Sequence, residues 1–175
     1  TVLAFHDPLT GLANLEGCRR ELERRLAQAE GHSWLVLWLD LDGFRRVNQS
    51  FGREVGDALL QTVANALRAW AAPSDLLARL GGDEFLLVRE LASSADDPVA
   101  LGRQAEAVLG ELRSVFSQLP VGEEIAPMAV GFSAGYSLAP LHGEQAEALL
   151  QGAATALSCA REVAPGTALA YQPRF

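Results

Sequence analysis

The chain has 175 residues, 49% of them hydrophobic, which is enough for one core and too little to expect two. Its net charge of −8 argues against a nucleic-acid polymer as partner, but not against a nucleotide held by a few arginines and a metal. No apolar run approaches the roughly 20 residues of a membrane span and no secretory signal pattern opens the chain, so we expect a cytoplasmic domain without direct membrane contact.

Cysteine and histidine usage favours structural roles. Cys18 and Cys159 lack metal-ligand or redox spacing and fall in helical patterns, so we expect small buried thiols in a reducing compartment. His6, His32 and His142 are scattered along the chain and form no ligand cluster. Neither residue type therefore predicts a metal site.

The first part of the chain predicts a helix and a buried strand. Residues 1–5 are expected to be a linker from an upstream region, and Asn14 is placed to cap a helix over about residues 15–29. Residues 34–39, Trp-Leu-Val-Leu-Trp-Leu, form a continuous apolar run of strand length. A strand that is apolar on both faces is usually central in its sheet.

The middle of the chain predicts a helix followed by a hairpin. Residues 44–48 are short and turn-like, and an apolar stripe then predicts a second helix over about residues 55–70. Two apolar runs, residues 75–80 and 85–88, flank Gly81-Gly82. Because glycine accepts the positive φ that a two-residue hairpin turn needs, the pattern predicts strand, turn and strand.

The last part of the chain predicts two helices and two strands. A polar loop over residues 92–98 precedes the longest helical stripe, at about residues 99–118. Clean alternation of large and small residues predicts a strand over residues 128–138. A helix over about 144–163 and a short strand near 168–171 follow. Mixed strands and helices with one hairpin predict an α/β sandwich with a largely antiparallel sheet.

Four carboxylates stand at strand ends, where chemistry is common. Asp40 and Asp42 end the first apolar run, and their spacing of two allows both to point to one face. Asp83 and Glu84 lie at the tip of the hairpin turn. Negative charges placed so near to one another are unfavourable unless a cation neutralises them. The arrangement therefore favours a divalent metal site shared with substrate phosphates. Two simpler explanations stay open: a solvated acidic turn, and Asp42 as the turn that leaves the strand.

These segments together resemble the GGDEF family, the diguanylate cyclases, over nearly the whole chain and in the right order. The matching segments are Asp7 to Asn14, Asp40 to Asn48, Phe51-Gly52, Gly56-Asp57, Arg79-Leu80, Gly81 to Phe85, Ala156-Leu157 and Ala160-Arg161. The resemblance implies one GGDEF domain over residues 1–175. It also implies the ferredoxin-like palm of nucleotidyl cyclases, with a mostly antiparallel five-stranded sheet flanked by helices.

The resemblance also implies a reaction, in which two GTP molecules become cyclic di-GMP and two pyrophosphates. Asp40, the carbonyl of Leu41, Asp83 and Glu84 would hold Mg²⁺ or Mn²⁺, and Asp83 would assist deprotonation of the ribose hydroxyl. Gly82 and Arg45 would complete the catalytic set. The positions that match the family's phosphate and ribose contacts are Gly43, Phe44, Arg45, Gly81, Gly82 and Arg161.

Asn48 and Asp57 match the family's guanine-reading positions. A carboxylate can accept from the N1–H and the exocyclic amine of guanine together, whereas adenine offers the wrong pattern, so GTP is expected over ATP. From the residues alone, the preferred explanation of both side chains is their place at a helix start, where a carboxylate is favoured by the helix dipole.

Several departures from the family pattern bear on activity. Leu15 and Ala154 stand where arginine and aspartate are usual, and Ala164-Pro165-Gly166 replaces Gly-Arg-Asn. Loss of one charge-assisted phosphate contact costs roughly 1.5–3 kcal/mol, or about 10- to 100-fold in GTP affinity. The inhibitory motif Arg-x-x-Asp is incomplete, because Asp75 is present but Ala72 replaces its arginine. We therefore expect no product inhibition of the usual type.

Three functions are compatible with this sequence. The first is a working diguanylate cyclase, active as a face-to-face homodimer because its product has two equal halves. The second is a catalytically weak or inactive GTP-binding module that controls a fused sensor or EAL phosphodiesterase domain. The third is a dimerisation domain whose acidic residues have no role. Retention of every metal and guanine position favours the first.

Overall fold

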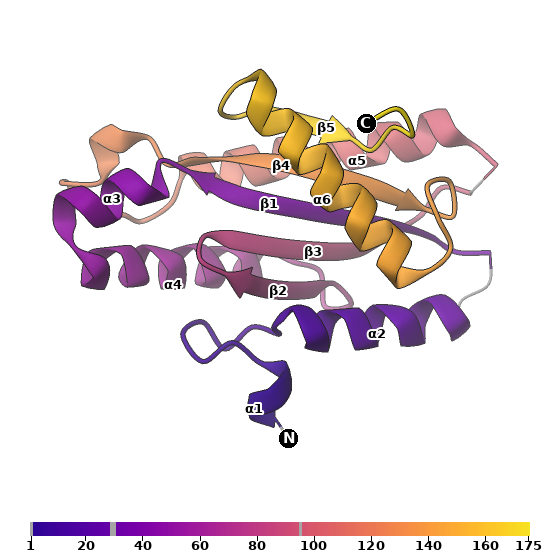
Figure 1. The fold of residues 1–175 in the computed structure, drawn as a ribbon, viewed down its shortest axis with the longest axis horizontal. Helices are drawn as coiled ribbons and strands as arrows, with labels where there is room; N and C mark the ends of the chain where they lie inside the picture. The colour runs from indigo at the N-terminus through magenta and orange to yellow at the C-terminus, as the bar shows by residue number, and fades with distance from the viewer. Residues whose placement is uncertain (1, 29–30, 95) are drawn as a thin grey trace.

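A computed structural model of the chain describes residues 2–28, 31–94 and 96–175. Helices and strands alternate along the chain around one sheet (Figure 1). The elements are α1 (Val2–Phe5), α2 (Leu15–Gln28), β1 (Ser33–Asp42), α3 (Phe44–Phe51), α4 (Arg53–Trp70), β2 (Leu76–Gly81), β3 (Glu84–Leu91), α5 (Pro98–Ser117), the 3₁₀ turn η1 (Ala126–Met128), β4 (Gly131–Ala139), α6 (Ala146–Val163) and β5 (Ala168–Ala170).

The five strands form one sheet in the order β2-β3-β1-β4-β5. β1 lies in the centre and pairs antiparallel with β3 and β4, as its two-sided apolar pattern predicted. β2 pairs antiparallel with β3, whereas β5 pairs parallel with β4. The predicted α/β class and the mostly antiparallel five-stranded sheet are therefore confirmed.

The two faces of β1 belong to two different hydrophobic clusters. Leu35, Leu37 and Leu39 pack with buried side chains of α4 and α5, while Trp34 and Val36 pack with those of α2 and α6. Successive strand residues point to opposite faces, so the continuous apolar run fills both layers. Figure 1 shows the result, with α6 crossing in front of the sheet and α4 and α5 behind it.

β4 and α6 approach each other unusually closely at Gly135. A Cβ atom built at this glycine would lie 2.0 Å from the backbone nitrogen of Leu157 and 2.4 Å from the carbonyl oxygen of Ala153. Both atoms are backbone and cannot move independently of the helix. The small residues predicted to allow a close approach on one face of this strand therefore serve that purpose.

The segment that follows β1 differs from its prediction. Residues 44–48 were expected to be turn-like, but they belong to the helix α3, which extends from Phe44 to Phe51. Gly43 enters the helix with a left-handed φ of 78°, and Gly52 ends it with its N–H bonded to the carbonyl of Asn48. Two turns of helix are too short for a sequence period to be recognised.

Smaller differences occur at element ends. The strand predicted from residue 128 begins at Gly131, because residues 126–128 form the turn η1. The helix expected over residues 15–29 extends to Gln28, and Ala29 lies outside the described residues.

The N-terminal segment packs on α2. Residues 2–5 of the expected linker form the short helix α1, and Thr1 lies outside the described part. The guanidinium of Arg20 stacks on the ring of Phe5, with 4.6 Å between its carbon and the ring centroid. In the described part of the chain, the structure has no helix that is long and apolar enough to span a bilayer.

Candidate active site

The hairpin turn lies directly beside the end of β1. Asp40 is the cross-strand partner of Glu84, and the N–H of Leu41 donates to the carbonyl oxygen of Asp83 at 3.1 Å. Two segments 42 to 44 residues apart in sequence therefore meet at their acidic ends, as the four-carboxylate pattern required.

The turn itself is built from glycine and held by an arginine. Gly82 and Asp83 form its two corner positions, while Gly81 still pairs with Glu84, so the turn lies one residue later than predicted. The φ angles of Gly81 and Gly82 are +120° and +51°. Arg79 donates to the carbonyl oxygen of Gly82 at 2.9 Å and to the carboxylate of Asp7 at 2.9 Å. This clamp fixes the turn against the N-terminal segment.

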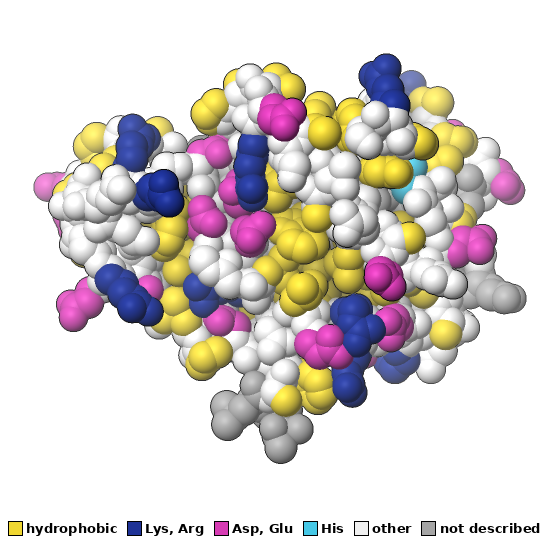
Figure 2. Space-filling view, in the orientation of Figure 1, with side chains coloured by type: hydrophobic (Ala, Val, Ile, Leu, Met, Phe, Trp, Pro, Cys, Tyr) yellow, Lys and Arg dark blue, Asp and Glu magenta, His cyan; other side chains and the backbone are white. Residues whose placement is uncertain are grey.

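A cavity of about 320 Å³ opens at this junction. Its walls come from the end of β1, α3, the turn, β4 and the segment that follows α6. They comprise Asp40, Leu41, Asp42, Gly43, Phe44, Arg45, Arg46, Asp83, Ser133, Arg161 and Pro165. Figure 2 shows acidic side chains around a basic one on this face, next to an exposed apolar area. Most residues predicted to bind metal or phosphate thus share one cavity.

The carboxylate of Asp40 is the most perturbed acid of the cavity. Its side chain is 15% exposed, and burial raises its pKa to about 6. The charge of Arg161 opposes this rise, while Asp83 and Asp42 add to it. Burial also raises the pKa of Asp83. A cation placed here would be stabilised because the cluster has more negative charge than its surroundings neutralise.

Arg161, in the last turn of α6, occupies a different place from the predicted one. The sequence placed it with the phosphate contacts, but its Nη2 lies 2.7 Å from Asp40 Oδ2 and 3.4 Å from Glu84 Oε1. The side chain is 43% exposed and therefore has room to move. It still lines the cavity, so a bound triphosphate would lie within its reach.

Two of the four acids bond to neighbouring strands. Glu84 accepts a hydrogen bond from the indole nitrogen of Trp38 at 3.1 Å, and Asp42 accepts one from the hydroxyl of Ser133 at 2.8 Å. Among residues 2–28, 31–94 and 96–175, no three His, Cys, Asp or Glu side chains are arranged to hold a metal ion. The four carboxylates lie near one another at this junction, and the metal-ligand roles of Asp40, Asp83 and Glu84 stay a prediction.

Asp40 nevertheless has a free ligand atom. Its Oδ1 is buried and makes no hydrogen bond within the described structure. A buried acceptor without a donor is costly, and a metal ion would satisfy it. Mg²⁺ binds through one or two carboxylates together with backbone oxygens, water and phosphates, so it does not need three acidic side chains. The residues present therefore fit a hard divalent cation.

The expected guanine site lies where α3 meets α4. Asn48 is on α3, and Asp57 is on α4 next to Gly56. A Cβ atom at Gly56 would lie 1.8 Å from Asn48 Oδ1, so a larger residue there would displace the asparagine. Within the described structure Asn48 Oδ1 is buried without a hydrogen-bond partner. An unpartnered acceptor suits the donors of a guanine edge.

The aspartate of the incomplete inhibitory motif is bonded to other residues of the domain. Asp75 binds Arg89 through two contacts at 2.7 and 3.1 Å, and its side chain is 1% exposed. The N–H of Ala72 also donates to Asp75, at 2.9 Å. The guanidinium of Arg89 in turn stacks on Trp70, 4.4 Å from its ring centroid. Asp75 is therefore engaged inside the domain.

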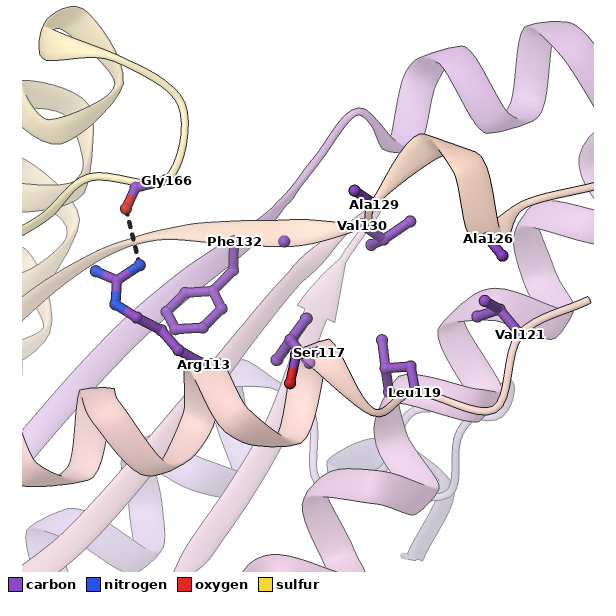
Figure 3. Close-up of a pocket in the computed structure, with 11 residues that line it drawn as sticks. Arg113, Ser117, Leu119, Val121, Ala126, Ala129, Val130, Phe132 and Gly166 are labelled. Atoms are coloured by element: carbon purple, nitrogen blue, oxygen red, sulfur yellow. Dashed lines mark hydrogen bonds between the residues drawn. The ribbon is translucent and has the colours of Figure 1, made fainter. Parts of the chain in front are cut away.

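A larger cavity lies away from the acidic residues. It measures about 570 Å³ and lies between α5, η1 and the start of β4 (Figure 3). Phe116, Leu119 and Phe132 give it an apolar wall, and Arg113 at its edge donates to the carbonyl oxygen of Gly166 at 2.9 Å. No carboxylate lines it. This cavity is larger than the acidic one, but the acids place the candidate chemistry in the smaller one.

A mixed sheet flanked by helices, with an acidic hairpin turn beside the end of its central strand, defines the class of GGDEF domain structures. The family model described as "Diguanylate cyclase, GGDEF domain" matches residues 4–164. The chain belongs to the GGDEF family.

Solved structures agree with this assignment. The GGDEF domain of TpbB from Pseudomonas aeruginosa has a TM-score of 0.80 at 29% identity, over 95% of this chain and 94% of that one. A sensory box/GGDEF family protein from Caulobacter crescentus has a TM-score of 0.80 at 35% identity, over 91% and 99%. The GGDEF domain of DgcB from Caulobacter crescentus, solved in complex with c-di-GMP, has a TM-score of 0.74 at 27% identity, over 95% of each chain.

Curated relatives are longer proteins with different activities. Diguanylate cyclase TpbB from Pseudomonas aeruginosa is 34% identical over 94% of this chain. Cyclic di-GMP phosphodiesterase PdeR from Escherichia coli is 32% identical over 99% of it. The chain spans 37% of the first protein and 25% of the second.

Sequence reasoning missed the residues that hold the acids. Trp38, Ser133 and Arg79 each bond to a carboxylate or to the turn, but none was expected to take part in the site. The available signal was the position of Trp38, two residues before Asp40 and therefore on the same face of β1. Trp38 is also a partly buried ring with one polar atom, which needs a partner.

Proposed function

We propose that this domain is a diguanylate cyclase that condenses two GTP molecules into cyclic di-GMP and two pyrophosphates. The observation that carries the proposal is the junction of β1 with the hairpin, where Asp40 faces Glu84 across the sheet and keeps one carboxylate oxygen unpartnered. A site of this kind suits a divalent ion with a nucleotide triphosphate.

Each step of the reaction joins a ribose 3′-oxygen to an α-phosphorus. The bond from that phosphorus to the bridging oxygen of the leaving pyrophosphate breaks, and the hydroxyl proton is lost. Asp83, whose pKa is raised by burial, is the proposed acceptor of this proton. Mg²⁺ or Mn²⁺, held by Asp40, the carbonyl of Leu41, Asp83 and Glu84, would supply positive charge against the triphosphate and the attacking oxygen.

The other cavity residues would bind the nucleotide. Gly43, Phe44 and Arg45 begin α3, whose N-terminal N–H groups favour phosphate oxygens. Once a metal ion neutralises the Asp40 carboxylate, Arg161 would be released from that carboxylate. The guanidinium of Arg161 would then bind phosphate oxygens. Gly81 and Gly82 let the backbone approach the substrate because they carry no side chain, and their positive φ angles would strain any other residue. Asn48 and Asp57 would read guanine.

One domain offers one such site, whereas the product has two equal halves joined by two equal bonds. Two copies must therefore meet face to face about a two-fold axis for the reaction. We infer a cytoplasmic location, where GTP is available and where Cys18 and Cys159, both free thiols, remain reduced. A sensor or EAL domain fused to this one would control the pairing.

The absence of a phosphate-binding cation at Pro165 favours a second candidate function. Pro165 lines the cavity where the family pattern has arginine, so triphosphate binding loses one charge-assisted contact. A domain that binds GTP without turnover would act as a regulatory module for an attached phosphodiesterase.

One assay separates these functions. The purified domain is incubated with GTP and Mg²⁺ or Mn²⁺, and the nucleotides are resolved by chromatography. Cyclic di-GMP that disappears in Asp83→Asn but persists in Glu111→Gln, an exposed acid on α5, supports the cyclase. GTP binding without product supports the regulatory module. No binding at millimolar GTP rejects both.

A further inference from the structure

Trp38 donates the closest hydrogen bond that Glu84 receives. The indole nitrogen lies 3.1 Å from Glu84 Oε1, and Arg161 reaches the same oxygen at 3.4 Å. Trp38 and Asp40 are two residues apart on β1, so both side chains point to the same face of the sheet. The ring therefore stands beside the acidic cavity with its one donor aimed at a proposed metal ligand.

The ring of Trp38 is partly buried and packs against the cluster of buried side chains from α2 and α6, which includes Leu22, Leu150 and Ala153. The ring also lines a cavity of about 390 Å³ whose other walls are Leu15, Arg19, Glu147, Leu150, Gln151 and Ala154. Leu15 and Ala154 are the two positions where the family pattern has arginine and aspartate, so the walls of this cavity lack two charges of that pattern. The buried side chains of the two helices therefore hold the indole.

Packing and the hydrogen bond act together on the orientation of Glu84. An indole held between a helix and a strand loses little further freedom when it donates, whereas the 43% exposed Arg161 side chain must be ordered to do the same. Ligands of metal ions depend on such neighbours, whose removal typically weakens metal affinity or activity about 10- to 100-fold.

We propose that Trp38 is a positioning residue of the active site: its indole N–H fixes the Glu84 carboxylate, and packing against the buried side chains of α2 and α6 fixes the indole. The contact itself is independent of the proposed function. Its effect on metal and GTP binding rests on that function.

The chain offers a matched control in Trp34. This tryptophan lies on the same face of β1, four residues earlier, and its indole nitrogen is buried with no hydrogen-bond partner in the described structure. Trp34→Phe and Trp38→Phe therefore remove the same atoms from the same strand, but only Trp38→Phe removes a hydrogen bond.

The contact is tested by ¹H–¹⁵N NMR of the three indole groups, assigned with Trp→Phe variants. Glu84→Gln is expected to shift the Trp38 signal and to leave those of Trp34 and Trp70 in place. An unchanged Trp38 signal would overturn the contact, whether or not the domain binds nucleotide.

The positioning role is tested by Mn²⁺ affinity, measured by water-proton relaxation, and by KM and kcat for GTP. Trp38→Phe should weaken Mn²⁺ binding about 10-fold while Trp34→Phe stays within about twofold of wild type. Adding Trp38→Phe to Glu84→Gln should cost little more Mn²⁺ affinity than Glu84→Gln alone, because the ligand that Trp38 positions has already been replaced. Equal behaviour of the two Phe variants would overturn the role. A wild-type domain that binds neither Mn²⁺ nor GTP would overturn the role and the proposed function together, while the NMR result would still report on the contact.

Discussion

Arg161 Nη2 lies 2.7 Å from Asp40 Oδ2, so a cation of the chain itself stands at the carboxylate that the proposed metal ion needs. Removing it should have opposite effects on two ligands. Arg161→Gln is expected to tighten Mn²⁺ binding in the absence of nucleotide, because a competing charge is lost, and to weaken GTP binding about 10- to 100-fold. Calorimetric titrations check both. Arg103→Gln, an exposed arginine on α5, is the control, and parallel changes in both affinities would contradict the competition.

Pro165 is the cavity position where a second cation would contact the triphosphate. Pro165→Arg should therefore tighten GTP binding about 10-fold through a charge-assisted hydrogen bond. Ala164→Arg adds the same charge one residue earlier, at an exposed position that does not line the cavity, and should change affinity much less. Equal gains in the two variants would mean that net charge, and not a phosphate contact, is responsible.

Asp75 is bound by Arg89 and is nearly inaccessible to solvent. Restoring the missing arginine of the inhibitory motif is therefore not enough to restore an inhibitory site. We expect wild type to show no inhibition by cyclic di-GMP, and Ala72→Arg to remain uninhibited. The double variant Ala72→Arg with Arg89→Ala, which releases Asp75 from the ion pair, should bind cyclic di-GMP more tightly than either single variant. Calorimetry with cyclic di-GMP measures this, and tight binding by Ala72→Arg alone would refute the explanation.

His142 should make stability depend on pH. Its Nδ1 accepts a hydrogen bond from the N–H of Leu138 at 2.9 Å, and burial lowers its pKa below the ordinary value of 6.5. The imidazole then binds a proton less readily in the folded chain than in the unfolded chain, so the contribution of His142 to the free energy of unfolding is greatest above pH 6.5 and declines as the pH falls below it. Urea titrations at several pH values should show this slope, and His142→Asn, which keeps an acceptor but does not titrate, should reduce it.

Gly135 should tolerate no side chain. Gly135→Ala places a Cβ atom against backbone atoms of α6 and should destabilise the domain by about 2 kcal/mol or more. Gly102→Ala, inside α5 with nothing within 4 Å of the added atom, should instead stabilise it by about 0.5–1 kcal/mol. Thermal unfolding of the two variants checks the contrast, and similar losses would remove the steric explanation.

The sequence predicted the fold correctly where a hydrophobic pattern or a glycine pair had one physical explanation. The apolar run of β1 implied a central strand, and Gly81-Gly82 implied the hairpin, but no pattern showed that the two lie side by side, as Asp40 and Glu84 do. α3 was missed because it has only two turns between glycines.

The orientation of the acidic side chains could not be predicted. Which way Glu84 turns depends on a tryptophan of the neighbouring strand, and where Arg161 lies depends on how α6 crosses the sheet. Such contacts join positions 46 and 77 residues apart, and spacing along one chain carries no information about them.

The seat of α6 on Gly135 ties the arginine end of that helix to the sheet. Because no side chain separates the two backbones at Gly135, α6 cannot move closer to β4 at this point, which limits how far the stem of Arg161 can move relative to Asp40. Changes in the shape of the cavity must then come from the rotamers of Arg161 and from the residues after Val163, while the position of α6 stays the same.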